Sequence, residues 1–402
     1  MSIFSKAEIL LPDCVNMEKW SVVACDQYTA QPEYWKRVSE FVGDAPSTLK
    51  IVYPEAFLSE GDSRISAINA EMQSYIDKKI FAELDGSLIY IERTLNSGKI
   101  RRGLVGQVDL EKYDFNKGSK SEIRATEGTI LQRIPPRVKI RENAPLELPH
   151  AILLMNDEDD KIMSSIAKEK LLYDFDLMEG GGHISGWLIS GMMADALIDR
   201  IDAFATNAKD NLVFAVGDGN HSLATAKTCW ENIKKTISAD EVPNHPARYC
   251  LVEIENIHDE ALEFEPIHRV VFDQSFDSVA QELKKYYDVS KTPTDSGQEI
   301  VMVCGDKTES FYIKNPSSGL TVGTLQNFLD AMGYELDYIH GEDVVRNLSK
   351  RDNTVGFILP CPEKNSLFET VISDGALPRK TFSMGEANEK RFYLEAKKIK
   401  KC

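Results

Sequence analysis

The sequence contains no apolar run that reaches the roughly 18 residues needed to span a bilayer. Residues 1–6 also lack the apolar core and the small-residue cleavage site of a secretory signal. These absences argue against a membrane-inserted chain, and they lead us to expect a cytoplasmic protein with no membrane partner.

Patterns typical of tightly bound metals are missing as well. The seven cysteines include no CxxC pair, and the seven histidines show neither HxxxH nor HExxH spacing. A disulfide framework and a dedicated zinc centre are therefore not expected. The Walker pattern GxxxxGK[ST] is absent too, which argues against a P-loop nucleotide site.

An excess of positive charge is also lacking, because the formal net charge is −17. Nucleic-acid partners are therefore not expected, since phosphate backbones require a concentrated basic surface. Short basic clusters remain, including Arg101-Arg102 and Arg379-Lys380. They suit small anions such as phosphate or carboxylate, although solvated surface charge explains each of them equally well.

The length of 402 residues exceeds the size at which single cores stop growing, about 250 to 300 residues, so two or three packed units are expected. We expect an N-terminal α+β region over 1–150, a central region over 151–275 and a C-terminal α/β region over 276–402. Strand patterns alternate with helix patterns along the chain. The fold class predicted is mixed α/β, with mixed sheets flanked by helices.

Local patterns predict individual elements. Residues 88–93 and 100–106 flank a turn-forming connection and suit a β-hairpin. Residues 65–79, 162–172 and 188–204 carry helical apolar spacing, whereas 20–24 looks like strand material. The proline-punctuated stretch 135–149 is expected to be an ordered loop.

The strongest chemical pattern is a strand that runs into a helix through Asp218-Gly219-Asn220-His221-Ser222. The apolar run 212–216 predicts a buried strand, and Ser222 suits the helix N-cap. Free backbone amides at such a helix start favour an anion, and Asp218 can accept a proton. A plain turn with a capping serine accounts for the local pattern equally well.

Four further residues are candidates outside this motif. Asp26 follows an apolar stretch that would deliver it to a sheet edge, and an Asx turn is the equal alternative. His183 follows three glycines that permit close approach to a ligand or form a flexible linker. His268 and Arg269 suit contact with a nucleotide or a substrate carboxylate. A half-buried His268 whose ring is hydrogen-bonded to backbone atoms fits the pattern equally well.

Several segments together resemble a known family. They are 101–104 (RRGL), 109–113 (DLEKY), the motif at 218–222, 266–271 (PIHRVV) and 377–385 (LPRKTFSMG). In this order they resemble the bacterial and archaeal family of domain of unknown function 1015. The central motif also resembles an Asp-Gly-His-His-Arg-type element of the ParB and sulfiredoxin superfamily, which includes enzymes that phosphorylate free L-serine with ADP or ATP.

The resemblance implies a phosphotransferase that acts on a small molecule, either free serine or phosphoserine, with an adenine nucleotide and Mg²⁺. A ParB/sulfiredoxin-like core is implied as well. Asp218, Asp26 and His221 would be catalytic, while Gly219, Asn220, Ser222 and His183 would bind phosphate or substrate. Asn220-His221-Ser222 replaces His-His-Arg, so another cation must neutralise phosphate, and Arg101, Arg102, His268 and Arg269 are candidates.

Two other functions are compatible with the same residues. A nucleotide or amino-acid sensor would use the Asp218 loop for binding without turnover, and then Asp26 would be incidental. A nuclease or DNA-partition role, known elsewhere in the superfamily, is disfavoured by the acidic charge balance. The sequence does not indicate an oligomeric state.

Overall fold

The computed structural model describes residues 2–129, 131–295 and 297–400. Contacts divide the chain into a first unit, Met1–Ala125 with Thr129–Leu262 and Glu386–Cys402, and a second unit, Thr126–Gly128 with Glu263–Gly385. This division differs from the three regions expected from the sequence. Strands from the first two expected regions share one sheet, and the end of the chain returns to that sheet's unit.

The first unit is built on a mixed sheet that has 11 strands within the described residues. The order is β5-β6-β11-β8-β12-β4-β3-β10-β9, with β1 paired to β4 and β2 to β3. Its strands are β1 (Phe4–Ser5), β2 (Ala7–Pro12), β3 (Phe81–Thr94), β4 (Ile100–Asp109), β5 (Tyr113–Asp114), β6 (Ile123–Ala125), β8 (Ile152–Met155), β9 (Lys170–Asp176), β10 (His183–Ile189), β11 (Phe214–Asp218) and β12 (Tyr249–Asn256).

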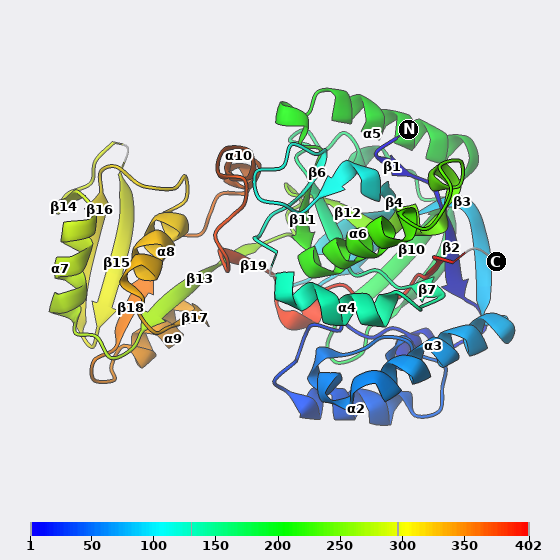
Figure 1. Cartoon of the computed structure of the whole chain (residues 1–402), viewed down its shortest axis with the longest axis horizontal. Coiled ribbons are helices and arrows are strands. Elements are labelled where there is room, and N and C mark those ends of the chain that lie inside the picture. Colours follow the sequence, from blue (N-terminus) through cyan, green and yellow to red (C-terminus); the bar gives the residue numbers. More distant parts are fainter. Residues whose placement is uncertain (1, 130, 296, 401–402) are drawn as a thin grey trace. The chain divides into compact units, whose positions relative to one another are not determined.

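Apolar clusters cover both faces of this sheet. In β3, Leu88 and Tyr90 belong to one buried cluster and Ile89 and Ile91 to another, as the alternation of side chains along a strand requires. The helices, which Figure 1 places around the sheet, are α1 (Met17–Trp20), α2 (Pro32–Val42), α3 (Gly61–Asp77), α4 (Ile134–Arg141), α5 (Gly191–Thr206) and α6 (Asn220–Lys234). Helices α2 and α3 contribute to the first cluster, and α5 and α6 to the second.

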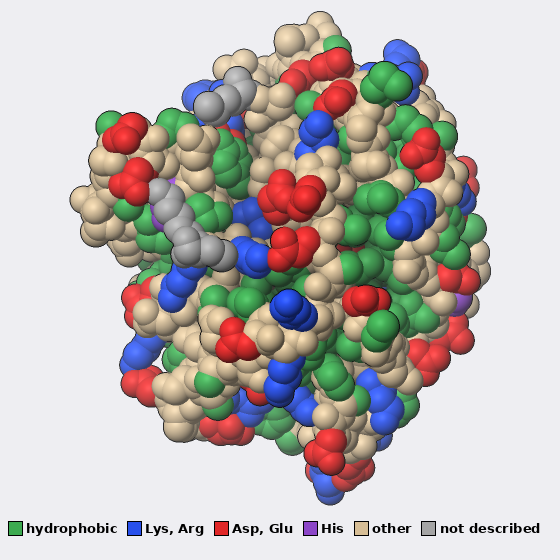
Figure 2. Space-filling model, turned by 90° about the vertical axis from the view of Figure 1, so that its right-hand side faces the viewer, with side chains coloured by type: hydrophobic (Ala, Val, Ile, Leu, Met, Phe, Trp, Pro, Cys, Tyr) green, Lys and Arg blue, Asp and Glu red, His purple; other side chains and the backbone are tan. Residues whose placement is uncertain are grey.

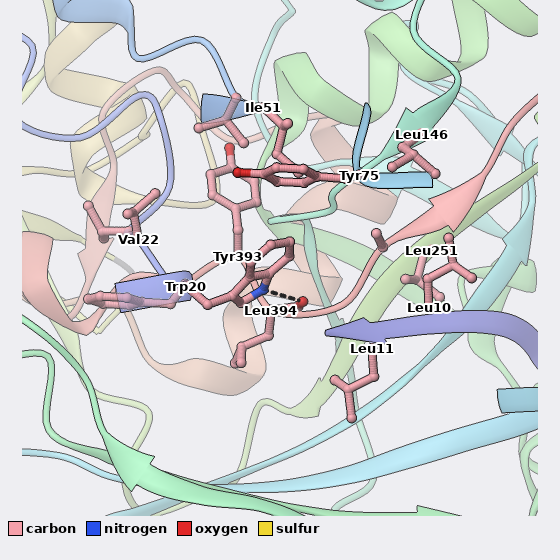
Figure 3. Packing of buried hydrophobic residues seen from close by; sticks show 14 of the residues in the cluster. Leu10, Leu11, Trp20, Val22, Ile51, Tyr75, Leu146, Leu251, Tyr393 and Leu394 are labelled. Atoms are coloured by element: carbon pink, nitrogen blue, oxygen red, sulfur yellow. Dashed lines mark hydrogen bonds between the residues drawn. The ribbon is translucent and has the colours of Figure 1, made fainter. Parts of the chain in front are cut away.

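The C-terminal segment is part of the first unit's core. Phe392 bridges Val23, Ala396 bridges Leu10, and β20 (Lys397–Lys398) pairs with β7 (Leu146–Glu147). The buried Trp20 indole donates to the Leu394 carbonyl at 2.9 Å, as Figure 3 shows. The segment therefore lies beside the residues that precede Asp26.

The second unit has its own sheet, with seven strands among the described residues in the order β14-β16-β15-β18-β13-β17 and β19 paired to β13. The strands are β13 (Phe264–Val271), β14 (Val289–Ser290), β15 (Gln298–Cys304), β16 (Lys307–Ile313), β17 (Leu336–His340), β18 (Val355–Ile358) and β19 (Phe382–Met384). The helices are α7 (Phe276–Tyr286), α8 (Thr321–Met332), α9 (Glu342–Leu348) and α10 (Lys364–Asp374). The mixed α/β class is thus confirmed.

Three local predictions are wrong. Residues 162–172 contain only a 3-10 turn, Met163–Ser165, and then the start of β9, which pairs with β10 from Lys170 onward. The expected loop at 135–149 begins with helix α4, whose first turn tolerates Pro135 and Pro136 because those amides need no intrahelical partner. Trp20 ends a short helix capped by Asn16 rather than starting a strand.

Other predictions are confirmed. Strands β3 and β4 form the expected antiparallel hairpin. Helix α3 contains most of the pattern at 65–79 and α5 most of the pattern at 188–204, although residues 188 and 189 still belong to β10. No described helix is both long and apolar enough to cross a membrane. Figure 2 shows acidic and basic side chains interspersed over one face, without a large area of a single sign.

Candidate active site

The strand, turn and helix entry predicted around Asp218 are present. Residues Phe214 to Val216 are buried in β11, Asp218 ends the strand, and α6 begins at Asn220. The N-cap is Gly219, with φ of 78°, so the prediction that Ser222 caps the helix is wrong. The left-handed backbone at Gly219 starts the helix earlier, and Ser222 lies within its first turn.

Glycine is required at position 219 for a second reason. A Cβ atom there would lie 2.8 Å from the Cα of Ala151. This close approach presses the turn against the residues that lead into β8. His150, which precedes Ala151, is thereby brought to the same end of the sheet.

A cation beside Asp218 comes from the C-terminal segment. Lys390 Nζ lies 3.6 Å from Asp218 Oδ2, and the side chains are only 14% and 18% exposed. Partial burial strengthens such a pair relative to one in open solvent. A lysine from the C-terminal segment thus supplies a positive charge beside a motif that lacks the arginine.

Asp26 lies close enough to Lys390 to respond to its charge. Burial alone would raise the pKa of Asp26, but the charge of His150, a hydrogen bond from the Gln27 amide and the charge of Lys390 together lower it. The Gln27 amide donates to Asp26 Oδ1 at 3.0 Å. Lys390 therefore acts on both candidate carboxylates, Asp26 and Asp218.

A buried aromatic and histidine pair lies beside Asp26. The Tyr393 hydroxyl and His150 Nδ1 are 2.8 Å apart, and the Cys25 amide donates to that hydroxyl at 3.2 Å. Burial raises the pKa of the Cys25 thiol to about 12, so this thiol is not a nucleophile at neutral pH. These contacts fix the backbone on which Asp26 stands.

Two buried arginines hold the backbone of Lys390. Arg93 donates to the carbonyl oxygens of Lys390 at 2.5 Å and Glu389 at 3.1 Å, and Arg101 donates to Glu389 at 3.0 Å. Arg101 Nε also lies 3.1 Å from the buried carboxylate of Glu255. Arg101 is only 6% exposed. Its contacts therefore position the segment that carries Lys390.

Arg102 and His183 are engaged by carboxylates. Arg102 pairs with Asp259 at 2.9 Å and with Asp160 at 2.8 Å. The His183 ring lies 2.9 Å from Asp174 and 2.7 Å from Asp176, and hydrogen bonds to these two carboxylates raise its pKa. The phosphate-binding role of both residues stays a prediction.

The glycines before His183 are part of the packed fold rather than a linker. His183 begins β10. A Cβ atom at Gly182 would lie 2.2 Å from the Thr94 carbonyl oxygen, and one at Gly181 would lie 2.6 Å from the Phe392 ring. Close backbone packing therefore accounts for these two glycines without a ligand.

His268 and Arg269 lie on β13 in the second unit. His268 Nδ1 accepts a hydrogen bond from the Leu359 amide at 3.1 Å, so the expectation of a histidine satisfied by backbone is confirmed. Arg269 is fully buried and donates to Gln326 and to backbone carbonyls. A direct contact with a substrate carboxylate is therefore not its role in this arrangement.

No sequence motif points to Lys390, His150 or Tyr393. Each lies outside any recognisable motif, in segments of ordinary composition. His221 and Asn220 lie in the first turn of α6, where the amide of Asn220 contacts the Val216 carbonyl at 3.4 Å. Within the described residues, no group of three or more His, Cys, Asp or Glu side chains could hold a metal ion.

Comparison with known proteins identifies the family. The model for protein of unknown function (DUF1015) matches residues 12–332. The chain belongs to this family. Among curated proteins no relative matches it.

Three solved structures are similar over most of their length. A free serine kinase in complex with AMP is 14% identical, with a TM-score of 0.37 over 73% of this chain and 90% of the kinase. A variant of a free serine kinase in complex with ADP is 14% identical, with a TM-score of 0.39 over 75% and 93%. C-terminally truncated SbnI from Staphylococcus aureus is 11% identical, with a TM-score of 0.36 over 70% and 83%.

Proposed function

We propose that the DUF1015 protein transfers a phosphoryl group between an adenine nucleotide and free serine or phosphoserine at the Asp218 turn. One observation carries the proposal: Lys390 Nζ lies 3.6 Å from Asp218 at the start of helix α6, and its charge also helps to lower the pKa of Asp26. Phosphoryl transfer requires such a combination of cation, carboxylates and oriented amide donors.

Phosphate binding falls to the helix start and to Lys390. The start of a helix directs backbone amides toward an anion, and Gly219 lets the backbone turn tightly before α6. Lys390 supplies a point charge beside this turn, the role that lysine commonly has at phosphate sites. His221 and Ser222, in the same first turn, add side-chain donors.

The two carboxylates divide the remaining tasks. One accepts the proton of the serine hydroxyl, and the other orients a divalent ion. We assign the base to Asp218, because it ends the strand at the helix start, and the orientation of the ion to Asp26. In the reverse direction the same carboxylate returns the proton to serine.

The donor set fits Mg²⁺ as a cofactor that binds together with the nucleotide. Mg²⁺ commonly takes one or two protein carboxylates and completes its shell with water and phosphate oxygens. Asp26 would supply one such carboxylate, whereas a closed protein-only site is not formed by the described residues. When bound, the ion would neutralise charge on the transferred phosphoryl group.

The decisive experiment incubates the purified chain with Mg²⁺ and three substrate pairs: serine with ATP, serine with ADP, and phosphoserine with ADP. Products are followed by phosphorus NMR and by chromatography of the nucleotides. We expect one pair to yield matched amounts of phospho-product and nucleotide. Nucleotide or amino-acid binding without turnover in any pair would instead support a sensor.

Variants connect any turnover to this site. Asp218→Asn should lower kcat by roughly two orders of magnitude or more, the usual size of a general-base contribution. Lys390→Gln should lower kcat/KM by a similar factor through lost charge stabilisation. Asp62→Asn and Lys398→Gln are matched controls, because both residues make exposed ion pairs elsewhere. Equal loss in variants and controls would remove the site from consideration.

A further inference from the structure

The second unit has an open surface cleft of about 560 Å³. Leu329 and Asp330 of α8, the following Gly333 and Tyr334, and residues of β17 line it. Its wall is apolar and aromatic apart from two charged side chains. These are Asp330 and Arg379. Arg379 belongs to the segment 377–385, which the proposed phosphotransferase site does not use.

The buried guanidinium of Arg269 organises this cleft. Its Nε donates to Gln326 at 3.1 Å, and the Gln326 amide donates to Asp330 Oδ1 at 2.8 Å. Its Nη2 donates to the Arg379 carbonyl at 3.1 Å. It also lies 4.6 Å from the centre of the Tyr338 ring. One fully buried charge thus holds both polar residues of the cleft and one aromatic wall.

Asp330 and Arg379 are available to a ligand. Their closest atoms are 3.4 Å apart, and the side chains are 55% and 61% exposed. Exposed pairs of this kind are weak, so a ligand with both charges can insert between them at little cost. A guanidinium binds a carboxylate in bidentate fashion, and a carboxylate binds an ammonium group.

We infer that this cleft binds an α-amino acid with an apolar or aromatic side chain. Arg379 takes the ligand carboxylate, Asp330 takes the ammonium group, and Leu329, Leu336 and Tyr334 contact the side chain. A nucleotide phosphate fits less well, because Asp330 stands beside the only arginine on the wall among the described residues and would repel it.

Titration calorimetry with the full chain tests this inference, with L-phenylalanine and L-leucine as probes. Binding of L-phenylalanine should be at least about tenfold tighter than binding of 3-phenylpropionate, which lacks the ammonium group, or of 2-phenylethylamine, which lacks the carboxylate. No binding of either amino acid at millimolar concentration, or tighter binding of AMP that Arg379→Gln abolishes, would overturn it.

Variants assign the binding to the cleft. Arg379→Gln and Asp330→Asn should each weaken L-phenylalanine binding by about ten- to a hundredfold, because each removes a charge-assisted hydrogen bond. Arg346→Gln is the matched control, since Arg346 makes an exposed pair with Glu342 on α9. Binding that survives both cleft variants contradicts the inference. Asp218→Asn should leave binding unchanged, which separates this site from the proposed phosphotransferase site.

Discussion

Arg93 donates a hydrogen bond of 2.5 Å to the backbone carbonyl of Lys390, and through it a residue of strand β3 holds the cation that faces Asp218. The same guanidinium reaches the carbonyls of Asn388 and Gly181. Burial lowers the pKa of Arg93 to about 9, so its charge persists at neutral pH. The interior of the first unit thus fixes one end of the candidate site.

Arg93→Met should lower the free energy of unfolding by about 3 kcal/mol, because it leaves several buried carbonyls without donors. Urea denaturation of the first unit measures the loss. Arg37→Met is the matched control, because Arg37 is 56% exposed in its pair with Glu179, and it should change stability by less than about 1 kcal/mol. Equal effects of the two variants would mean that the Arg93 contacts contribute little.

Gly219→Ala should destabilise the protein more than Gly118→Ala. Both glycines have positive φ, 78° and 80°, so both substitutions strain the backbone. Only at Gly219 would the new Cβ collide with Ala151, whereas nothing lies within 4 Å at Gly118. We expect about 1 kcal/mol of loss at Gly118 and about 2 to 3 kcal/mol more at Gly219. Thermal unfolding compares them, and indistinguishable midpoints would contradict the close packing of the turn.

Glu255 should make stability depend on pH. Burial raises the pKa of Glu255 to about 8, against the lowering charge of Arg101. Between the unperturbed value near 4.5 and 8, the unfolded chain ionises this group while the folded protein keeps the proton. Stability from this group is therefore full below pH 4.5 and falls as pH rises to about 8.

Glu255→Gln imitates the protonated acid and should remove this dependence. We expect the free energy of unfolding of the variant, measured by urea denaturation at several pH values, to rise relative to that of the parent protein up to about pH 8. Above that pH the difference should stay constant. Glu83→Gln, at an exposed residue paired with Lys398, should change the pH profile little. Parallel profiles of Glu255→Gln and the parent would show that Glu255 ionises normally.

His183 should contribute stability at acid pH. Hydrogen bonds to Asp174 and then Asp176 raise its pKa, so the folded state favours the protonated ring. Its contribution is full below the unperturbed pKa of 6.5 and is lost as pH rises through the higher folded value. The stability difference between the parent and His183→Gln should therefore shrink above pH 6.5, a trend that chemical denaturation at pH 5.5 and 8.5 can detect. A difference that grows with pH would contradict the two contacts.

Much of the architecture could be predicted from local pattern. The hairpin of β3 and β4, helices α3 and α5, and the strand before Asp218 follow from apolar periodicity and turn residues. The form of segment 162–172 could not be predicted, because its spacing suits a helix whereas its last residues, from Lys170 onward, pair with β10. Helix α4 was not predicted, because Pro135 and Pro136 indicated a loop although the first turn of a helix accepts proline.

The sequence by itself predicted the strand, turn and helix entry at Asp218, because short-range chemistry governs them. The need for a cation beside the turn followed from the family resemblance, and the role of Asp26 stays a prediction. Only the tertiary structure showed that Lys390, on the segment held by Arg93 and Arg101, lies beside Asp218. It also showed that Arg269, a candidate ligand contact, is buried and that it holds residues of a separate cleft through its hydrogen bonds. Such roles depend on long-range packing of the final chain segment and of β13, which no local pattern encodes.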